Sequence, residues 1–194
     1  IPVLPVYVDS PMATEALKYY SARVAELDPE LRPTSGQVYA FATTRFQTIA
    51  SPQQSKELTA SRRPAIVVSS SGMATGGRVL HHLAAALPDQ RNTVLFVGYQ
   101  AEGTRGRQLV DGARDVRIHG HSIAVNASIA KIDSMSAHAD RGEILRWLGT
   151  LGSAPHRLCL VHGEPAPMDA LKGLIQERLS WTPYTPGHGE TIEL

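Results

Sequence analysis

The 194-residue sequence is poor in several features that would define its class. Its single cysteine, Cys159, excludes an internal disulfide and favours a reducing compartment, so we expect a cytoplasmic protein. No apolar run approaches the roughly 18 residues of a membrane span, and no membrane partner is expected. The net charge of +1 gives no global reason to bind nucleic acid, so any anion-binding surface must be local.

Start signals and zinc-binding clusters are also missing. The chain begins Ile-Pro-Val, without an initiator methionine or the basic start of a signal peptide, and we expect it to be part of a longer protein. The clusters Cys-x-x-Cys, His-Glu-x-x-His and His-x-His-x-Asp-His do not occur. Because one histidine cannot hold zinc, these residues alone do not predict a complete metal site.

The residues that are present describe an ordinary globular protein, with 42% hydrophobic and 19% charged residues. Short apolar runs alternate with helical periodicity, which predicts an α/β fold with a largely parallel sheet. The strands expected are residues 3–8, 65–68, 93–97, 116–118, 123–129, 157–161 and 191–194. The helices expected are residues 12–27, 52–61, 79–87, 141–148 and 165–179, with a short one after residue 107. The strands after residue 115 look antiparallel, which indicates two lobes, 1–115 and 116–194.

Two strand–loop–helix junctions are candidates for anion binding. Residues 69–78 are small and precede a helix, so their backbone amides can approach a phosphate. The spacing of a P-loop or a dinucleotide fingerprint is absent, and a tight turn that serves helix packing is the alternative. Residues 98–107 follow the next strand and should face the same crevice. There Arg105 and Arg107 are candidate phosphate contacts, and Glu102 would orient one of them; a solvated charged loop is the alternative.

Two histidines stand where an apolar strand gives way to a turn and a helix. His138 precedes one expected helix, and His162 follows the expected strand 157–161. An imidazole at such a position is held rigidly with an open edge, which suits a metal ligand or a proton donor. Taken singly, each is more often structural. We expect His82 on the surface of its helix and His188 in a structural turn.

Four motifs in order and spacing then give the chain a family resemblance. They are residues 70–78, 98–104, 136–140 and 161–164, and the likeness extends from residue 7 almost to the C-terminus. Together they resemble the β-CASP branch of the metallo-β-lactamase-fold nucleases, which includes the pre-mRNA cleavage-and-polyadenylation endonuclease. The resemblance implies that residues 1–115 are the later part of a Rossmann-like β-CASP lobe. Residues 116–194 would then be the C-terminal part of the metallo-β-lactamase domain.

The resemblance also implies roles for individual residues. His138 would act near the scissile phosphate as general acid or transition-state stabiliser, and His162 would be a zinc ligand. Such enzymes hold two zinc ions between the lobes, and members with histidine at the position of His162 tend to act on RNA. The implied RNA- and phosphate-binding residues are Ser136, Ser71, Gly72, Gly76, Gly77, Arg78, Glu102, Thr104 and Arg105.

The expected function is therefore that of a C-terminal portion of a zinc-dependent RNA phosphodiester hydrolase, an endonuclease or a 5′ exonuclease. The portion alone should be inactive and should bind zinc weakly or not at all, because most ligands would precede Ile1. A non-catalytic RNA-binding or scaffold subunit is the alternative, although it would need neither His138 nor His162. A Rossmann-like nucleotide-binding module would need a phosphate loop that is absent. Apolar surface exposed in such a portion would allow a homodimer.

Overall fold

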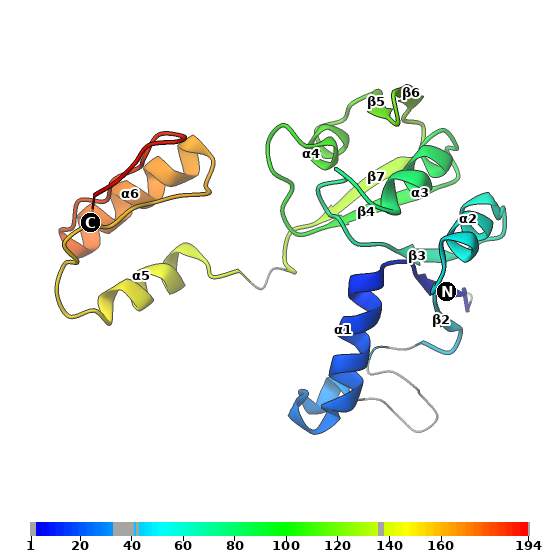
Figure 1. The fold of residues 1–194 in the computed structure, drawn as a ribbon, viewed down its shortest axis with the longest axis horizontal. Coiled ribbons are helices and arrows are strands. Elements are labelled where there is room, and N and C mark those ends of the chain that lie inside the picture. The colour runs from blue at the N-terminus through cyan, green and yellow to red at the C-terminus, as the bar shows by residue number, and fades with distance from the viewer. Residues whose placement is uncertain (1–2, 33–40, 42, 136–137, 194) are drawn as a thin grey trace. The chain divides into compact units, whose positions relative to one another are not determined.

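The computed structural model describes residues 3–32, 41, 43–135 and 138–193 (Figure 1). The chain divides into two compact units, Ile1–Met135 and Ser136–Leu194, and each is described by itself. The fold is mixed α/β with parallel strand pairing, as the sequence predicts. The lobe boundary expected near residue 115 stays a prediction. No helix among those described is long and apolar enough to cross a membrane.

A three-stranded parallel sheet opens the first unit, in the order β2-β1-β3. Its strands are β1 (Val6–Val8), β2 (Phe46–Thr48) and β3 (Ile66–Val68). Two helices and two 3-10 turns accompany it: α1 (Pro11–Ala22), η1 (Val24–Glu26), η2 (Pro29–Leu31) and α2 (Pro52–Ala60). Ser10 caps α1 by accepting the N–H of Ala13, and proline occupies the first helical position. The helix expected to reach residue 27 ends at Ala22 and continues as 3-10 turns.

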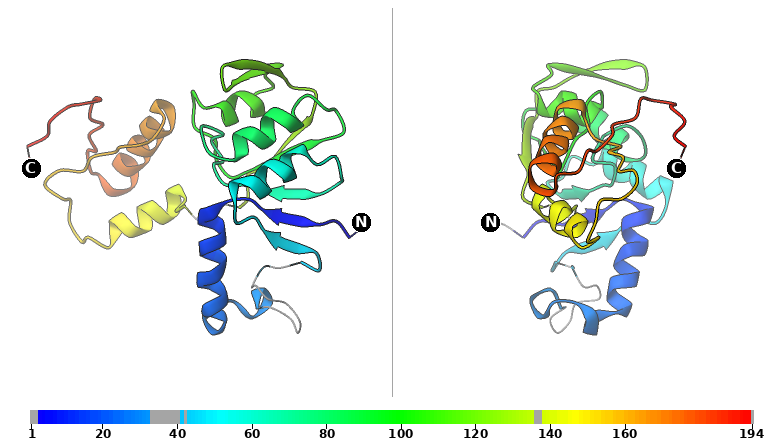
Figure 2. Two further views of the ribbon diagram at one scale, coloured as in Figure 1. Left: turned by 45° about the vertical axis from the view of Figure 1, so that its right-hand side comes forward. Right: turned by 90° about the vertical axis from the view of Figure 1, so that its left-hand side faces the viewer.

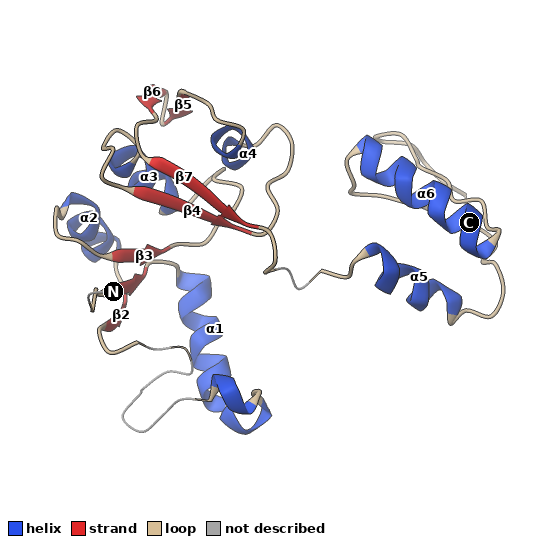
Figure 3. Cartoon of the chain, turned by 180° about the vertical axis from the view of Figure 1, so that it is seen from behind, coloured by secondary structure: helices blue, strands red, loops and turns tan. Residues whose placement is uncertain are grey.

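A second pair of parallel strands, β4 (Thr93–Val97) and β7 (Ser128–Ile132), lies side by side in Figure 3. The helix α3 (Val79–Ala86) precedes β4 in the chain. Between β4 and β7 come α4 (Arg105–Val110), β5 (Asp115–Ile118) and β6 (His121–Ala124). The β5–β6 hairpin is antiparallel, as expected. The expectation of one strand over residues 123–129 is wrong. The amides of Asn126 and Ala127 both donate to the carbonyl of Leu87, which ends β6 before the chain enters β7.

The core of the first unit lies between α3, α4 and the strands that they cover. Leu80, Leu83 and Leu87 stand at helical spacing on one face of α3 and are almost fully buried. They pack with Phe96 of β4 and with side chains of α4 and β5, among them Leu109. On its other side α3 lies beside α2 (Figure 2). This packing holds α3 in place, and the loop that leads into α3 is one of the candidate phosphate sites.

The second unit contains two helices, α5 (Arg141–Gly149) and α6 (Pro165–Leu179), as the sequence predicts. Leu148, Ile175 and Pro183 are its most buried side chains. The strand expected at 157–161 is wrong: the structure has only an isolated bridge between Cys159 and Tyr184. Residues 191–193 of the last expected strand have no strand structure either, and Leu194 lies outside the described residues. Apolar residues at both places predicted strands, but a strand also needs a paired neighbour.

Candidate functional site

The first candidate loop, residues 69–78, connects β3 to α3. Ser71 and Ala74 have φ values of 83° and 50°, which L-residues other than glycine seldom adopt. Such conformations cluster at ligand-binding and catalytic loops. Arg78 stands at the N-cap of α3, but its side chain makes no capping hydrogen bond. The amides of Leu80 and His81 in the first turn of α3 donate to the carbonyls of Gly77 and Arg78, so N–H groups for an anion would have to come from the loop before the helix.

The second candidate loop, which follows β4, lies directly against the first. The amide of Gly106 donates to the carbonyl of Met73 at 2.9 Å, and the amide of Ala101 lies 3.1 Å from the Met73 sulfur. A Cβ atom at Gly106 would fall 2.6 Å from the carbonyl oxygen of Gly72, so only glycine permits this approach. The two loops meet although β3 and β4 belong to separate hydrogen-bonded sheets.

Arg105 and Arg78, which are expected to contact phosphate, already donate hydrogen bonds to other groups of the protein. Arg105 donates from Nε to the carbonyl of Arg117 at 2.7 Å, and its Nη1 donates to the carbonyl of Ala74. Arg78 donates from Nη1 to the Asp9 carboxylate at 2.7 Å. A guanidinium has five N–H donors, so some remain for a ligand. The phosphate-binding roles of both arginines stay predictions. The structure shows in addition that both side chains link segments of the first unit by hydrogen bonds.

The remaining residues expected to bind RNA or phosphate are Thr104, Glu102, Ser136 and the glycines of the first loop. Thr104 is the N-cap of α4, and its hydroxyl accepts the amide of Arg107 and donates to the carbonyl of Ala101. Glu102 is exposed in the same loop. Ser136 lies outside the described residues. The glycines at 72, 76 and 77 lie in the first loop, where a Cβ would meet nothing within 4 Å. Their role as RNA contacts stays a prediction.

Behind the first loop lies a buried carboxylate that the motifs do not reveal. Asp9 ends β1 and has no exposed surface. Its Oδ1 accepts from Arg78, while its Oδ2 accepts from Ser55 Oγ at 2.5 Å and lies 2.7 Å from His82 Nε2. Burial by itself raises the pKa of Asp9. The hydrogen bonds from Ser55, Arg78 and His82 outweigh it and hold the pKa below the ordinary 3.8. The network ties β1, α2 and α3 to the base of the candidate loop.

The expectation that His82 lies on the surface is wrong, because its side chain is only 13% exposed. Its Nε2 must carry the proton in the bond to Asp9, since an ionised carboxylate only accepts. Its Nδ1 lies 3.0 Å from the hydroxyl of Thr59 on α2. One sequence signal was available: His82 follows Val79 by three residues and so borders the apolar face of α3.

His162 belongs to the second unit and stands between the Cys159–Tyr184 bridge and α6. It is exposed and has a φ of 67°, a left-handed conformation in which histidine is more frequent than most residues. The next residue, Gly163, permits a close approach, because a Cβ there would fall 2.4 Å from Cγ of Met168. The first turn of α6 thus packs onto the backbone beside His162 and holds the residue in place.

His138 is exposed and lies two residues before Asp140, the N-cap of α5. Asp140 accepts the Glu143 amide at 2.7 Å, and the Glu143 carboxylate accepts the Asp140 amide at 2.9 Å. This capping box fixes the backbone that follows His138. The structure places both histidines in one unit with exposed side chains, and their catalytic and metal-binding roles stay predictions.

The residues present do not fit a complete zinc site. In the described parts of the chain, no three His, Cys, Asp or Glu side chains are grouped so that they could hold a metal ion. An exposed imidazole such as that of His162 suits one ligand position, but protein zinc sites use three or four protein ligands. A zinc ion bound here would require ligands from outside these residues.

Two known domain families match the segments of the chain that contain the four motifs. The Beta-Casp domain profile matches residues 1–109, and the profile of a Zn-dependent metallo-hydrolase RNA specificity domain matches residues 122–186. The chain belongs to the β-CASP family of RNA-processing nucleases. The resemblance seen in the four motifs is thereby confirmed. The α/β architecture of the first unit is the fold that the family predicts.

Curated relatives agree with this assignment. Transcription termination factor FttA of Pyrococcus abyssi is 33% identical over 200 residues, which are 98% of this chain and 30% of the relative. Ribonuclease TTHA0252 of Thermus thermophilus is 35% identical over 179 residues, 92% of this chain and 41% of that enzyme. FttA of Methanocaldococcus jannaschii is 28% identical over 200 residues. The chain therefore spans less than half the length of these relatives.

Proposed function

We propose that this chain is the C-terminal part of a zinc-dependent ribonuclease, with residues 1–115 in the β-CASP lobe and the rest in the metallo-β-lactamase domain. The observation that carries the proposal is the exposed imidazole of His162, held in a left-handed conformation inside the segment that matches an RNA specificity domain. The name of the Thermus relative, a ribonuclease, supports RNA as the substrate.

In this proposal the paired loops of the first unit bind the RNA backbone. The small residues of the loop before α3, such as Ser71 and Gly76, present backbone N–H groups to phosphate oxygens. The side chains of Thr104 and Arg105 extend that surface, and Ser136 adds a hydroxyl. Contacts of this kind position a nucleic acid but read little of its sequence.

The two histidines carry separate roles. His138 donates a proton to the departing 3′ oxygen, a role that suits an exposed imidazole at a helix start. His162 supplies one ligand to zinc, whose remaining ligands come from outside the described residues. Since the described residues contain no group of three ligands that could hold the metal, the 194 residues by themselves should not hydrolyse RNA.

The role of His162 is tested by His162→Ala in the longer protein. We expect the zinc content, measured by atomic absorption, to fall together with ribonuclease activity, because one first-sphere ligand is lost. His188→Ala is the matched control: it removes another exposed histidine of the same unit. Unchanged zinc content and activity in His162→Ala would refute the ligand role.

The role of His138 is tested by His138→Ala in the same protein. General acid catalysis contributes about 10²–10⁴-fold to rate, so turnover should fall by that order while zinc content stays near normal. His188→Ala again serves as control. A His138→Ala variant with full turnover would overturn the assignment.

A second candidate is a non-catalytic RNA-binding subunit. It is favoured by the name of the FttA relatives, which are transcription termination factors. In that case the two histidine variants would leave zinc content unchanged, there would be no ribonuclease activity for them to reduce, and RNA binding would persist. The same two experiments therefore separate the candidates.

A further inference from the structure

The second unit contains a hollow of about 460 Å³ whose lining the proposed function does not use. An aromatic pair, two basic side chains and one carboxylate line it: Trp181, Tyr184, His156, Arg157 and Glu190. The volume lies within the roughly 300–1,000 Å³ of small-ligand pockets. Most of these residues are exposed, so the hollow is open to a ligand from solvent. A ligand that carries both a ring and charged or polar groups would match its lining.

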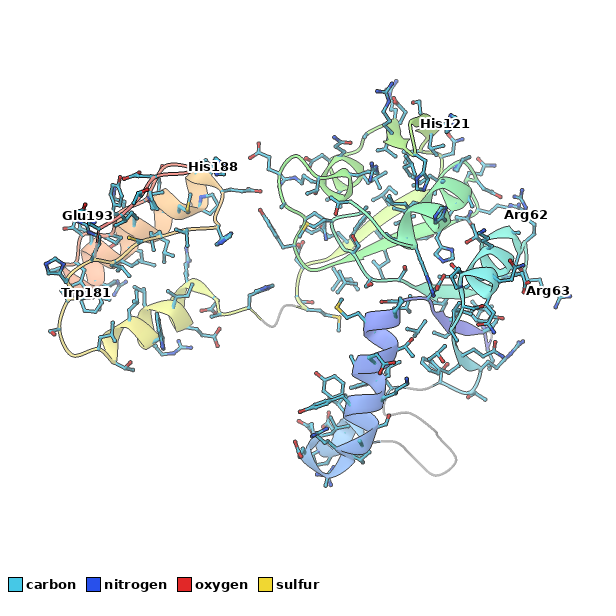
Figure 4. The ribbon with its side chains drawn as sticks, in the orientation of Figure 1. Arg62, Arg63, His121, Trp181, His188 and Glu193 are labelled. Carbon is cyan, nitrogen blue, oxygen red and sulfur yellow. The ribbon has the colours of Figure 1, made fainter. Side chains whose placement is uncertain are left out.

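The walls of the hollow are held by backbone pairing. The amide of Leu160 donates to the carbonyl of Tyr184, and the amide of Tyr184 donates to the carbonyl of Leu158, both at 2.8 Å. Tyr184 therefore cannot move independently of the segment that carries Arg157. Trp181 directly follows Ser180, which ends α6 in a left-handed conformation. Figure 4 shows Trp181 and Glu193 at this C-terminal end of α6.

The charged groups are oriented as well. Glu190 accepts the Tyr184 hydroxyl at Oε1 and the Gly187 amide at Oε2, the latter at 2.7 Å. The hydrogen bond from Tyr184 and then that from Gly187 lower the pKa of Glu190, so the carboxylate stays ionised at neutral pH. Each oxygen keeps a further lone pair for a donor. Arg157 donates from Nη1 to the Glu193 carbonyl at 2.6 Å, which leaves its other N–H groups for an anion.

We propose that this hollow binds one nucleotide of single-stranded RNA. The base stacks on Trp181, an amino group of the base donates to Glu190, and the adjoining phosphate binds Arg157. Stacking on aromatic rings is how proteins hold splayed RNA bases, carboxylates accept from the cytosine amino group, and guanidinium binds phosphate. The base must be unpaired, because a duplex hides its faces. The inference shares RNA as the partner with the proposed function but does not depend on hydrolysis.

The test uses the intrinsic fluorescence of the chain. There are two tryptophans, Trp147 and Trp181, so Trp147→Phe leaves Trp181 as the single tryptophan, which is excited selectively over tyrosine. Trp147 is 65% exposed on α5 and does not line the hollow. Pentacytidylate and pentauridylate are the probes, because cytosine presents an amino group where uracil presents a carbonyl oxygen. We expect both to quench Trp181, with the lower Kd for pentacytidylate.

Variants then assign the parts of the hollow. Trp181→Ala should raise the Kd about 5- to 150-fold, which is the range for loss of a stacked base. Trp181→Phe should raise the Kd less, because it keeps an aromatic ring. Binding to these two variants is measured by fluorescence anisotropy of labelled probes, since they lack the Trp181 signal. Arg157→Ala should weaken both probes and flatten the salt dependence, since one phosphate contact is lost. Glu190→Gln should remove the preference for pentacytidylate. Trp147→Ala and Arg146→Ala, exposed positions in the same unit, are the matched controls and should bind as the parent does.

Several results would overturn the proposal. The first is that neither probe quenches Trp181. The second is that Trp181→Phe and Trp181→Ala, shown by circular dichroism to be folded, bind with unchanged Kd. Equal losses in Trp147→Ala and Trp181→Ala would show general surface binding. Binding of an acidic peptide in place of RNA would also reject it. Because this chain alone is not expected to hydrolyse RNA, these outcomes are independent of the histidine experiments.

Discussion

Asparagine in place of Asp9 removes one charge from the centre of the buried network beneath the candidate loop. The carboxylate has no exposed surface, and it joins Ser55, Arg78 and His82, which come from α2 and the N-terminal part of α3. An asparagine side chain has nearly the same shape but keeps only one acceptor oxygen, and its NH₂ group faces a donor. Asp9→Asn therefore breaks at least one bond to a charged group without opening a cavity.

The expected magnitude follows from burial. Removing one partner of a buried ion pair costs roughly 3–5 kcal/mol, and each hydrogen bond to a charged group contributes about 1.5–3 kcal/mol. Arg78 and His82 keep 20% and 13% of their side-chain surface exposed, so water can partly solvate them after the change. We expect a loss near the lower limit, about 3 kcal/mol in the free energy of unfolding of the first unit.

The loss should also depend on pH. The pKa of Asp9 in the folded chain lies below 3.8, its ordinary value, so the folded state favours the ionised form. The stabilisation is then complete above the unfolded pKa and disappears as the pH falls through the folded pKa. The difference between wild type and Asp9→Asn should be constant from neutral pH down to about pH 5 and should shrink below pH 3.8.

Urea unfolding followed by circular dichroism measures both quantities. Asp111→Asn is the matched control, because Asp111 pairs with Arg107 on the surface and its side chain is 58% exposed. Such an exposed pair contributes less than about 1 kcal/mol. If Asp9→Asn destabilised the chain no more than Asp111→Asn, the reasoning from burial and hydrogen bonding would be refuted.

Two further predictions concern the first unit. Gly106→Ala should destabilise it by about 1–3 kcal/mol, because the new Cβ would lie 2.6 Å from the Gly72 carbonyl oxygen. Gly76→Ala in the same unit, where a Cβ meets nothing within 4 Å, should be nearly neutral in the same urea titration; equal losses would contradict the packing argument. Asp89 should titrate with a pKa of about 2, because Arg91 donates hydrogen bonds to its carboxylate. In Arg91→Gln an NMR titration should find that pKa raised toward 3.8, although the backbone amide of residue 91 still donates to the carboxylate. An unchanged pKa would show that the Arg91 side chain is not the cause.

Local signals predicted much of the fold. The strand Thr93–Val97 and the helix Pro165–Leu179 have the bounds expected from apolar runs, proline and capping residues. Those signals act within a few residues, so a sequence displays them directly. The family motifs likewise predicted the β-CASP assignment, since they are contiguous stretches of sequence.

The errors arose where structure depends on a partner far along the chain. Residues 157–161 have the composition of a strand, yet only Cys159 finds a bridge, to Tyr184. His82 was expected on the surface because its acceptor, Asp9, lies 73 residues away in sequence. The residues next to Cys159 and His82 in the sequence do not indicate which distant residue each of them contacts.

The sequence by itself determined the α/β alternation, the N-terminal caps of three helices, the two loops and the two histidines, because propensity and capping are properties of neighbouring residues. Only the tertiary structure decided that the loops touch through Gly106, that Arg78 and His82 enclose Asp9, and that Trp181 and Glu190 line one hollow. Burial and hydrogen bonding join groups that the chain separates, and they act only after it has folded.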